Sequence, residues 1–244
     1  MSTEMAAHDS TGRWAERARS LYDASYARKY RDRDNELLAA KSNQELIDWL
    51  GGVCDRFDHP IDVLDLGCGT GRYFWGLRRV ASLTGLDASA PMLEEARHPL
   101  YAERLAGVST TLIEGDLRSH AFAPASFDLV YSVGVLAEHV PLDRAIVDRV
   151  HSWLRPGGRF AFTTVHPQSP SIARTLPRLL ASAIVAALPP ALTGRLHERL
   201  VGGGMYGDER WISAVLAGPF RIETLERFTS DVHLHGRCVA RKAS

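Results

Sequence analysis

The sequence predicts an α/β fold built on a doubly wound, mostly parallel sheet. Between residues 53 and 165, short apolar runs that end on acids alternate with helical segments, which is the pattern of a parallel sheet covered by helices. The first run leads into a turn dense in glycine, and the second ends on an acid that lies twenty positions after the first of these glycines. Together these observations indicate a pocket for a nucleotide-type ligand at the carboxyl edge of the sheet.

The first apolar run, residues 61–66, is predicted to be a buried strand that turns into a ligand-binding loop. Three glycines within residues 67–71 let the backbone turn tightly and approach a ligand at a helix N-terminus. Arg72 stands where a dinucleotide fingerprint would have its third glycine. Asp65 would repel a pyrophosphate at close range. The loop therefore favours a cationic ligand over a nicotinamide dinucleotide.

The other elements follow in the order that a doubly wound sheet needs. Apolar and aromatic residues recur at helical spacing from Trp14 to Tyr30, and a second helix is expected from Glu36 to about Leu50. A helix over 142–154 is expected to end at the turn Arg155-Pro-Gly-Gly158. Further strands are expected in apolar runs at 83–86, 111–116, 127–133, 159–165, 220–225 and 232–239.

A long segment, residues 166–204, interrupts the sheet pattern before the closing strands. Its apolar stretch Leu179–Leu188 is broken by Pro189 and Pro190 and predicts helical pieces. We expect a mobile, partly apolar lid over an acceptor pocket, with a dimer contact or a solvated decoration as the other interpretation. The expected organisation is a single domain over 1–244, with cap helices at 1–52, a cofactor-binding core at 53–165, the insertion at 166–204, and a closing helix and strands at 205–244.

The strand, acid and Gly-x-Gly-x-Gly turn of residues 61–71 resemble the first motif of the class I S-adenosylmethionine-dependent methyltransferases. The resemblance runs from about Ile61 to Val165 and resumes near Met205. It implies S-adenosylmethionine as the cofactor and a seven-stranded Rossmann-like sheet with its last strand antiparallel. In that family the first acid and the glycine loop hold the methionine part, the second acid holds the ribose, and a third acid lies beside the adenine. The resemblance assigns to this site Asp65, Gly67, Cys68, Gly69, Gly71, Asp87, Ala88, Asp116, Leu117 and Ser132.

A stripe of tyrosines precedes the core at helical spacing: Tyr22, Tyr26 and Tyr30. Such a stripe is more often core or interface packing than ligand contact. N-terminal helices commonly close over the cofactor in the family that the chain resembles. The resemblance therefore adds Tyr22 and Tyr30 to the expected cofactor site.

Two histidines are the candidates for acid-base chemistry. Methyl transfer from a sulfonium mainly needs alignment and exclusion of water, but a hydroxyl acceptor benefits from a proton acceptor with the pKa of histidine. His139 follows the fourth predicted strand and His166 follows the fifth, both at strand ends where open α/β sheets bind ligands. A structural histidine is the alternative interpretation of each.

The amino-acid composition indicates which partners and which cellular compartment to expect. Formal net charge is zero, so no global field recruits nucleic acid or an anionic membrane. The three cysteines form no metal-ligand spacing and leave an odd number for disulfides, which fits a reducing cytoplasm. Neither a secretory signal nor a run of eighteen apolar residues is found, so we expect a cytoplasmic protein without membrane insertion, with a homodimer as an open expectation.

The expected function is methyl transfer from S-adenosylmethionine to an O, N or C nucleophile of a small organic acceptor, such as an apolar secondary metabolite or a quinone precursor. Three alternatives stay open. A tRNA methyltransferase would need a basic patch, and only the short basic segments Arg28–Arg31 and Arg195–Arg199 indicate one. A binding protein without catalysis would bind the cofactor without turnover. A nicotinamide oxidoreductase is opposed by Asp65 and Arg72.

Overall fold

The computed structural model describes residues 12–37, 40–170, 206–230 and 233–243. Its seven strands form one mixed sheet in the order β3-β2-β1-β4-β5-β7-β6, which confirms the predicted doubly wound fold. The chain divides into two compact units, residues 1–131 and 132–244, and each is described by itself below. The organisation as a single domain stays a prediction.

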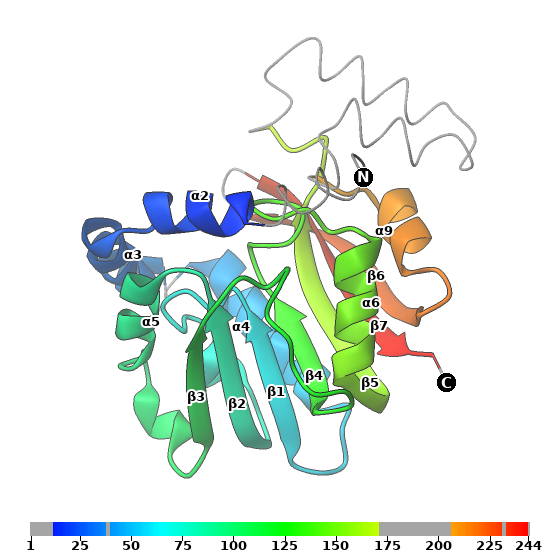
Figure 1. Ribbon diagram of the computed structural model, residues 1–244, viewed down its shortest axis with the longest axis horizontal. Helices are drawn as coiled ribbons and strands as arrows, with labels where there is room; N and C mark the ends of the chain where they lie inside the picture. The colour runs from blue at the N-terminus through cyan, green and yellow to red at the C-terminus, as the bar shows by residue number, and fades with distance from the viewer. Residues whose placement is uncertain (1–11, 38–39, 171–205, 231–232, 244) are drawn as a thin grey trace, which may run out of the picture. The chain divides into compact units, whose positions relative to one another are not determined.

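Four parallel strands organise the first unit: β1 (Ile61–Leu66), β2 (Val80–Asp87), β3 (Ser109–Glu114) and β4 (Phe127–Ser132). The central strand β1 lies between β2 and β4 and is buried almost throughout, because both of its faces are covered (Figure 1). Asp65 pairs in register with Gly85 on one side and Tyr131 on the other. The parallel order brings the acids after β1, β2 and β3 to the same carboxyl edge.

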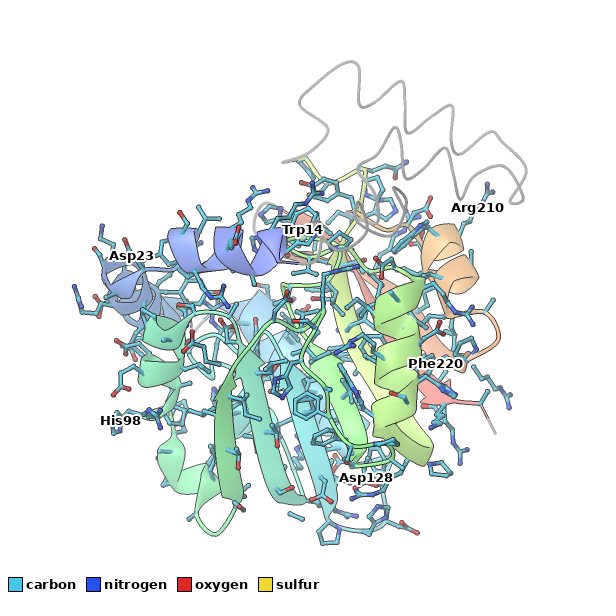
Figure 2. The ribbon with its side chains drawn as sticks, in the orientation of Figure 1. Trp14, Asp23, His98, Asp128, Arg210 and Phe220 are labelled. Atoms are coloured by element: carbon cyan, nitrogen blue, oxygen red, sulfur yellow. The ribbon has the colours of Figure 1, made fainter. Side chains whose placement is uncertain are left out.

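The helices of the first unit correct the prediction for the N-terminal region. The expected helix from Trp14 to Tyr30 is two helices, α2 (Arg13–Leu21) and α3 (Ala24–Leu37). Asp23 separates them, because its carboxylate accepts a hydrogen bond from the backbone N–H of Tyr26 at 2.8 Å and so begins a new helix (Figure 2). Glu36 belongs to α3, so the helix expected from that residue was wrong at its start; α4 covers Lys41–Cys54.

Three short helical segments complete the first unit. They are η1 (Phe74–Gly76) after the glycine loop, α5 (Ala90–Ala96) after β2, and η2 (Ala102–Leu105) before β3. Ser89 caps α5 by accepting from the backbone N–H of Met92 at 3.3 Å. The residue that caps α5 therefore lies two positions after Asp87, at the candidate ribose-binding edge.

The second unit contains α6 (Arg144–Trp153), β5 (Leu154–Val165), α9 (Glu209–Leu216), β6 (Phe220–Ser230) and β7 (His233–Lys242). Strand β7 is antiparallel to both β5 and β6, as the resemblance implies. The turn expected at 155–158 was wrong, because the chain leaves α6 in extended conformation at Leu154 and enters β5 directly. Most of the expected lid over 166–204 lies outside the described residues, because these do not include residues 171–205. Among the helices that the structure describes, none is long and apolar enough to cross a membrane.

Candidate functional site

The glycine loop after β1 has the backbone shape that the sequence predicts. Gly69 and Gly71 have φ of 54° and 72°, in the left-handed region that disfavours side chains. A Cβ at Gly71 would lie 2.7 Å from the ring of Phe74. Cys68 is buried with its backbone N–H directed to Leu86 O at 3.2 Å. The loop thus has glycine where a side chain would be strained or would collide with Phe74, and its backbone is fixed by hydrogen bonds within the protein.

Asp87 joins this loop to the end of β2. Its Oδ2 accepts from the N–H of Gly69 and its Oδ1 accepts from the N–H of Ser89, both at 2.9 Å. Burial raises the pKa of Asp87, and hydrogen bonds from the backbone of Ser89, Gly69 and Ala88 oppose that rise. A carboxylate has about four acceptor positions, so Asp87 keeps the capacity to accept from a ribose hydroxyl.

Asp65 is a buried acid beside the same loop. Its residue is 3% exposed, and burial raises its pKa to about 8, while the Tyr131 hydroxyl lowers it and the Asp87 charge raises it further. The Tyr131 hydroxyl faces Asp65 closely enough to affect it, yet it lacks the geometry of a hydrogen bond to any described residue. Asp65 is therefore mostly protonated at neutral pH until a positive charge approaches it.

The raised pKa of Asp65 predicts how stability depends on pH. Because the native state keeps a proton on Asp65 that the unfolded chain loses above its usual pKa of 3.8, the free energy of unfolding should fall as pH rises from about 4 to about 8. This contribution has a slope of up to about 1.4 kcal/mol per pH unit. Urea unfolding of the wild type and Asp65→Asn between pH 5 and 8.5 measures it. The difference between the two should grow with pH; a constant difference would contradict the assignment.

The other expected cofactor residues lie at the same carboxyl edge or near it. Asp116 lies two residues beyond the end of β3, where its Oδ1 accepts from the N–H of Arg118 at 2.8 Å. Leu117 is buried, and Ala88 is partly exposed beside Asp87. Ser132, fully buried, is the last residue of β4 and belongs to the second unit.

The tyrosine stripe meets the site through its backbone and rings. The carbonyl of Tyr22 accepts from the Ser89 hydroxyl at 2.6 Å, which ties the end of α2 to the α5 cap. The Arg72 guanidinium lies 4.5 Å from the centre of the Tyr30 ring, a cation–π contact. Burial raises the pKa of Tyr30 to about 12. Tyr30 therefore packs against Arg72, the residue that stands where a dinucleotide fingerprint would have its third glycine.

Asp34 is a site residue that the sequence analysis missed. Its carboxylate is fully buried, accepts from the Thr70 hydroxyl at 2.5 Å, and forms an ion pair with Arg72 of the glycine loop. Arg31, one turn earlier on α3, donates to the backbone carbonyls of Thr70 at 2.7 Å and Glu95 at 2.5 Å. Helix α3 thus holds the glycine loop through a buried network of charges.

One sequence signal could have found Asp34. The stripe Tyr22, Tyr26 and Tyr30 has a spacing of four, and the next position in that series is Asp34. An acid on the face that tyrosines occupy is a buried charge, and a buried charge needs partners. The partners, Thr70 and Arg72, lie 36 and 38 positions away, so only the structure identifies them.

In the second unit, the loop after β4 presents Glu138 and His139. The loop is closed by hydrogen bonds from the backbone N–H groups of His139 and Val140 to Val135 O at 2.8 and 3.0 Å. Burial raises the pKa of Glu138 to about 7. His139 Nε2 lies 3.7 Å from Glu138 Oε1, and the histidine side chain is 44% exposed. The pair combines a carboxyl group that titrates near neutrality with an accessible imidazole.

His166 has a different environment. It is 3% exposed, its Nδ1 accepts from the N–H of Gln168 at 3.1 Å, and its Nε2 lies 3.6 Å from Glu209, which is paired with Arg227. Burial lowers the pKa of His166, so the ring is neutral at pH 7 with its proton on Nε2. The Nδ1 lone pair is already occupied, which leaves His166 poorly prepared to accept a proton from a substrate.

Comparisons with known proteins identify chains that resemble this one. A family model described as a methyltransferase domain matches residues 63–158. The chain is 36% identical over 119 residues to a ubiquinone biosynthesis O-methyltransferase of Serratia proteamaculans, covering 48% of this chain and 45% of that protein. It is 28% identical over 218 residues to a nocamycin O-methyltransferase of Saccharothrix syringae, covering 86% and 72%. The chain spans about half the length of most of the curated relatives it matches.

Solved structures match over more of the chain. A magnesium protoporphyrin IX methyltransferase of Synechocystis with bound S-adenosylhomocysteine has a TM-score of 0.64 at 19% identity, covering 94% of this chain and all of that one. An S-adenosylmethionine-dependent methyltransferase of Mesorhizobium loti has a TM-score of 0.54 at 26% identity, covering 75% and 92%. The first of these supports the fold alone, and the second agrees with the family model.

Proposed function

From its membership of the class I S-adenosylmethionine-dependent methyltransferase family, we propose that this chain transfers the methyl group of S-adenosylmethionine to an O, N or C nucleophile of a small organic acceptor. The observation that carries the proposal is the link between the glycine loop and Asp87, whose carboxylate is held by two backbone N–H groups at 2.9 Å. The relatives named for ubiquinone and nocamycin support an apolar or quinone-like acceptor.

The residues at the carboxyl edge of the first unit fit the cofactor. The remaining acceptor capacity of Asp87 suits a ribose hydroxyl, and the glycine loop is held beside it by the Gly69 N–H. Asp65 suits the positive charge of the methionine amine, which would favour its ionised form and so release a proton on binding. S-adenosylmethionine supplies an activated methyl group on a sulfonium. The protein's contribution is to bind, orient and exclude water.

For an acceptor that must lose a proton, we assign the proton acceptor to the pair Glu138 and His139. Glu138 titrates near neutrality, which is the range in which a general base is most effective. His139 is accessible, and its imidazole lies within reach of that carboxyl group. His166, the other histidine expected from the sequence, is assigned to holding the end of β5 through Gln168 and Glu209.

Variants of this pair test the assignment. We expect His139→Ala and Glu138→Gln each to lower kcat by about 100-fold, because a positioned base typically contributes 10²–10⁴-fold, while the affinity for S-adenosylhomocysteine stays unchanged. His98→Ala, an exposed histidine of the first unit, is the matched control. Turnover is measured against pH with the purified acceptor. Full activity in both variants would mean that the acceptor needs no base.

Partners and location follow from the same proposal. With a formal net charge of zero, a small acceptor is favoured over tRNA, and a cytoplasmic enzyme fits three free, buried cysteines. We retain the single-domain organisation, the participation of Tyr22 and Tyr30 in the cofactor site, and the homodimer as parts of the proposal.

Thermal unfolding in the presence of ligands tests the function. S-adenosylmethionine or S-adenosylhomocysteine at about one hundred times its dissociation constant should raise Tm by about 5 °C or more, because a ligand that binds only the native state stabilises it. NAD at the same concentration should leave Tm unchanged. Stabilisation by NAD alone would overturn the proposal. If S-adenosylmethionine binds but no acceptor in an extract of the source cell is methylated, the chain is a cofactor-binding protein without catalysis.

A further inference from the structure

The first unit contains a cavity that the proposed reaction does not use. Its volume is about 420 Å³, within the range of small-molecule sites, and it lies among α4, η1 and η2. Leu77 and Arg78 on its wall lead into the amino end of β2, and Tyr101 and Arg104 lead toward the amino end of β3. Asp128, at the amino end of β4, marks this edge of the sheet in Figure 2. The cavity is therefore on the edge opposite the glycine loop.

The wall of this cavity is aromatic and carries an unpaired cation. The rings of Trp75 and Tyr101 meet edge to face with their centres 5.0 Å apart. The Arg104 guanidinium lies 5.2 Å from the Trp75 ring centre and 5.7 Å from that of Tyr101. Tyr101 is 43% exposed. Within the described part of the chain, the Arg104 side chain has no carboxylate or hydrogen-bond partner, so its charge is available to a ligand.

Two further observations narrow the ligand. Trp75 is only 9% exposed, and its indole N–H is buried without an acceptor among the described residues. The other charges on the wall are already engaged: Arg78 pairs with Asp55 at 2.5 Å, and Asp48 accepts from the Gln44 amide at 3.1 Å. What the cavity offers a ligand is therefore the Arg104 cation beside the rings of Trp75 and Tyr101.

We propose that this cavity is a second binding site for a small planar aromatic anion, with its negative group at Arg104 and its ring against Trp75 and Tyr101. An aromatic carboxylate suits this wall, because its oxygens accept from a guanidinium and its ring packs against aromatic side chains. The carboxylate of Asp48 repels an anion, so the negative group of the ligand should lie away from Asp48 and close to Arg104. The site is independent of S-adenosylmethionine, since none of its lining residues belongs to the proposed cofactor site.

Titration of the ¹⁵N-labelled protein with sodium benzoate tests the proposal. The indole N–H resonance of Trp75, assigned by its loss in Trp75→Phe, should shift and saturate with a dissociation constant in the millimolar range. Cyclohexanecarboxylate, which has the charge without the aromatic ring, and benzylammonium, which has the ring with the opposite charge, should bind about tenfold more weakly or not at all. Phenyl phosphate distinguishes a general anion site from one selective for carboxylates.

Two variants should change benzoate affinity in opposite directions. Arg104→Gln should weaken it about tenfold through loss of the charged donor, and Asp48→Asn should strengthen it through loss of a like charge. Arg97→Gln, an exposed arginine outside the cavity, is the matched control, and S-adenosylhomocysteine affinity should be unchanged in all three. No saturable shift of the Trp75 resonance, equal binding of benzylammonium, or unchanged affinity in Arg104→Gln would overturn the proposal.

Discussion

Replacing Asp87 by alanine is expected to weaken S-adenosylhomocysteine binding by about 100-fold or more. The carboxylate would accept from ribose hydroxyls, and a hydrogen bond to a charged group contributes about 1.5–3 kcal/mol. The same carboxylate also holds the N–H groups of Gly69 and Ser89, so its removal releases the glycine loop as well. Isothermal calorimetry measures the dissociation constant, and urea unfolding verifies that the variant is folded.

Two further variants separate the roles of Asp87. Asp87→Asn keeps one acceptor oxygen and should lose less affinity than Asp87→Ala. Glu94→Ala, an exposed acid on the neighbouring helix α5, should bind the cofactor normally. If Asp87→Ala is folded and keeps the wild-type dissociation constant, Asp87 does not bind the ribose, and the site drawn around it is wrong.

The second large effect is expected at Asp34. Asp34→Ala leaves Arg72, whose side chain is 14% exposed, without its carboxylate partner, while Arg31 keeps Glu95 at 3.5 Å. Breaking a buried ion pair from one side typically costs about 3–5 kcal/mol, because the remaining charge is buried and uncompensated. At about 2–4 °C for each kcal/mol in a chain of this size, Tm should fall by roughly 10 °C. Differential scanning calorimetry measures the change.

Neighbouring variants control for a simple helix effect. Asp32→Ala changes the same residue type on the same helix at an exposed position, and it should leave Tm within about 2 °C of the wild type. Asp34→Asn keeps an acceptor for the Thr70 hydroxyl but has no charge, so its Tm should lie between those of Asp34→Ala and Asp32→Ala. Equal Tm values for Asp34→Ala and Asp32→Ala would mean that the network adds nothing to stability.

Local patterns predicted the strand and loop of the site well. Residues 61–66 form β1 as expected, because their apolar side chains and the glycines that follow encode a buried strand and a tight turn without help from distant residues. The same holds for β4 and for most of β2. The strand before Asp116 was also predicted, although it ends at Glu114 rather than at Asp116.

The parts of the site that the sequence did not predict depend on contacts between residues far apart in the chain. Asp34 gains its importance from Thr70 and Arg72, and the environment of His166 depends on Glu209 and Arg227 from later elements. No periodicity encodes such pairs. Asp23 is a helix-capping residue just before α3, and this local signal was present in the sequence. It was missed because the regular spacing of the tyrosines continues across Asp23 and suggested one unbroken helix.

The attachment of α3 to the glycine loop also limits how this chain can be divided. The family model begins at residue 63, and a fragment cut there would contain the whole glycine loop but not Asp34 or Arg31. Arg72 would then carry its charge in the loop without a counter-ion from α3. In a chimaera with a related methyltransferase, residues 31–34 and 70–72 therefore need to come from the same parent. Helix α3 and the glycine loop therefore have to be kept together, although α3 lies outside the segment that the family model matches.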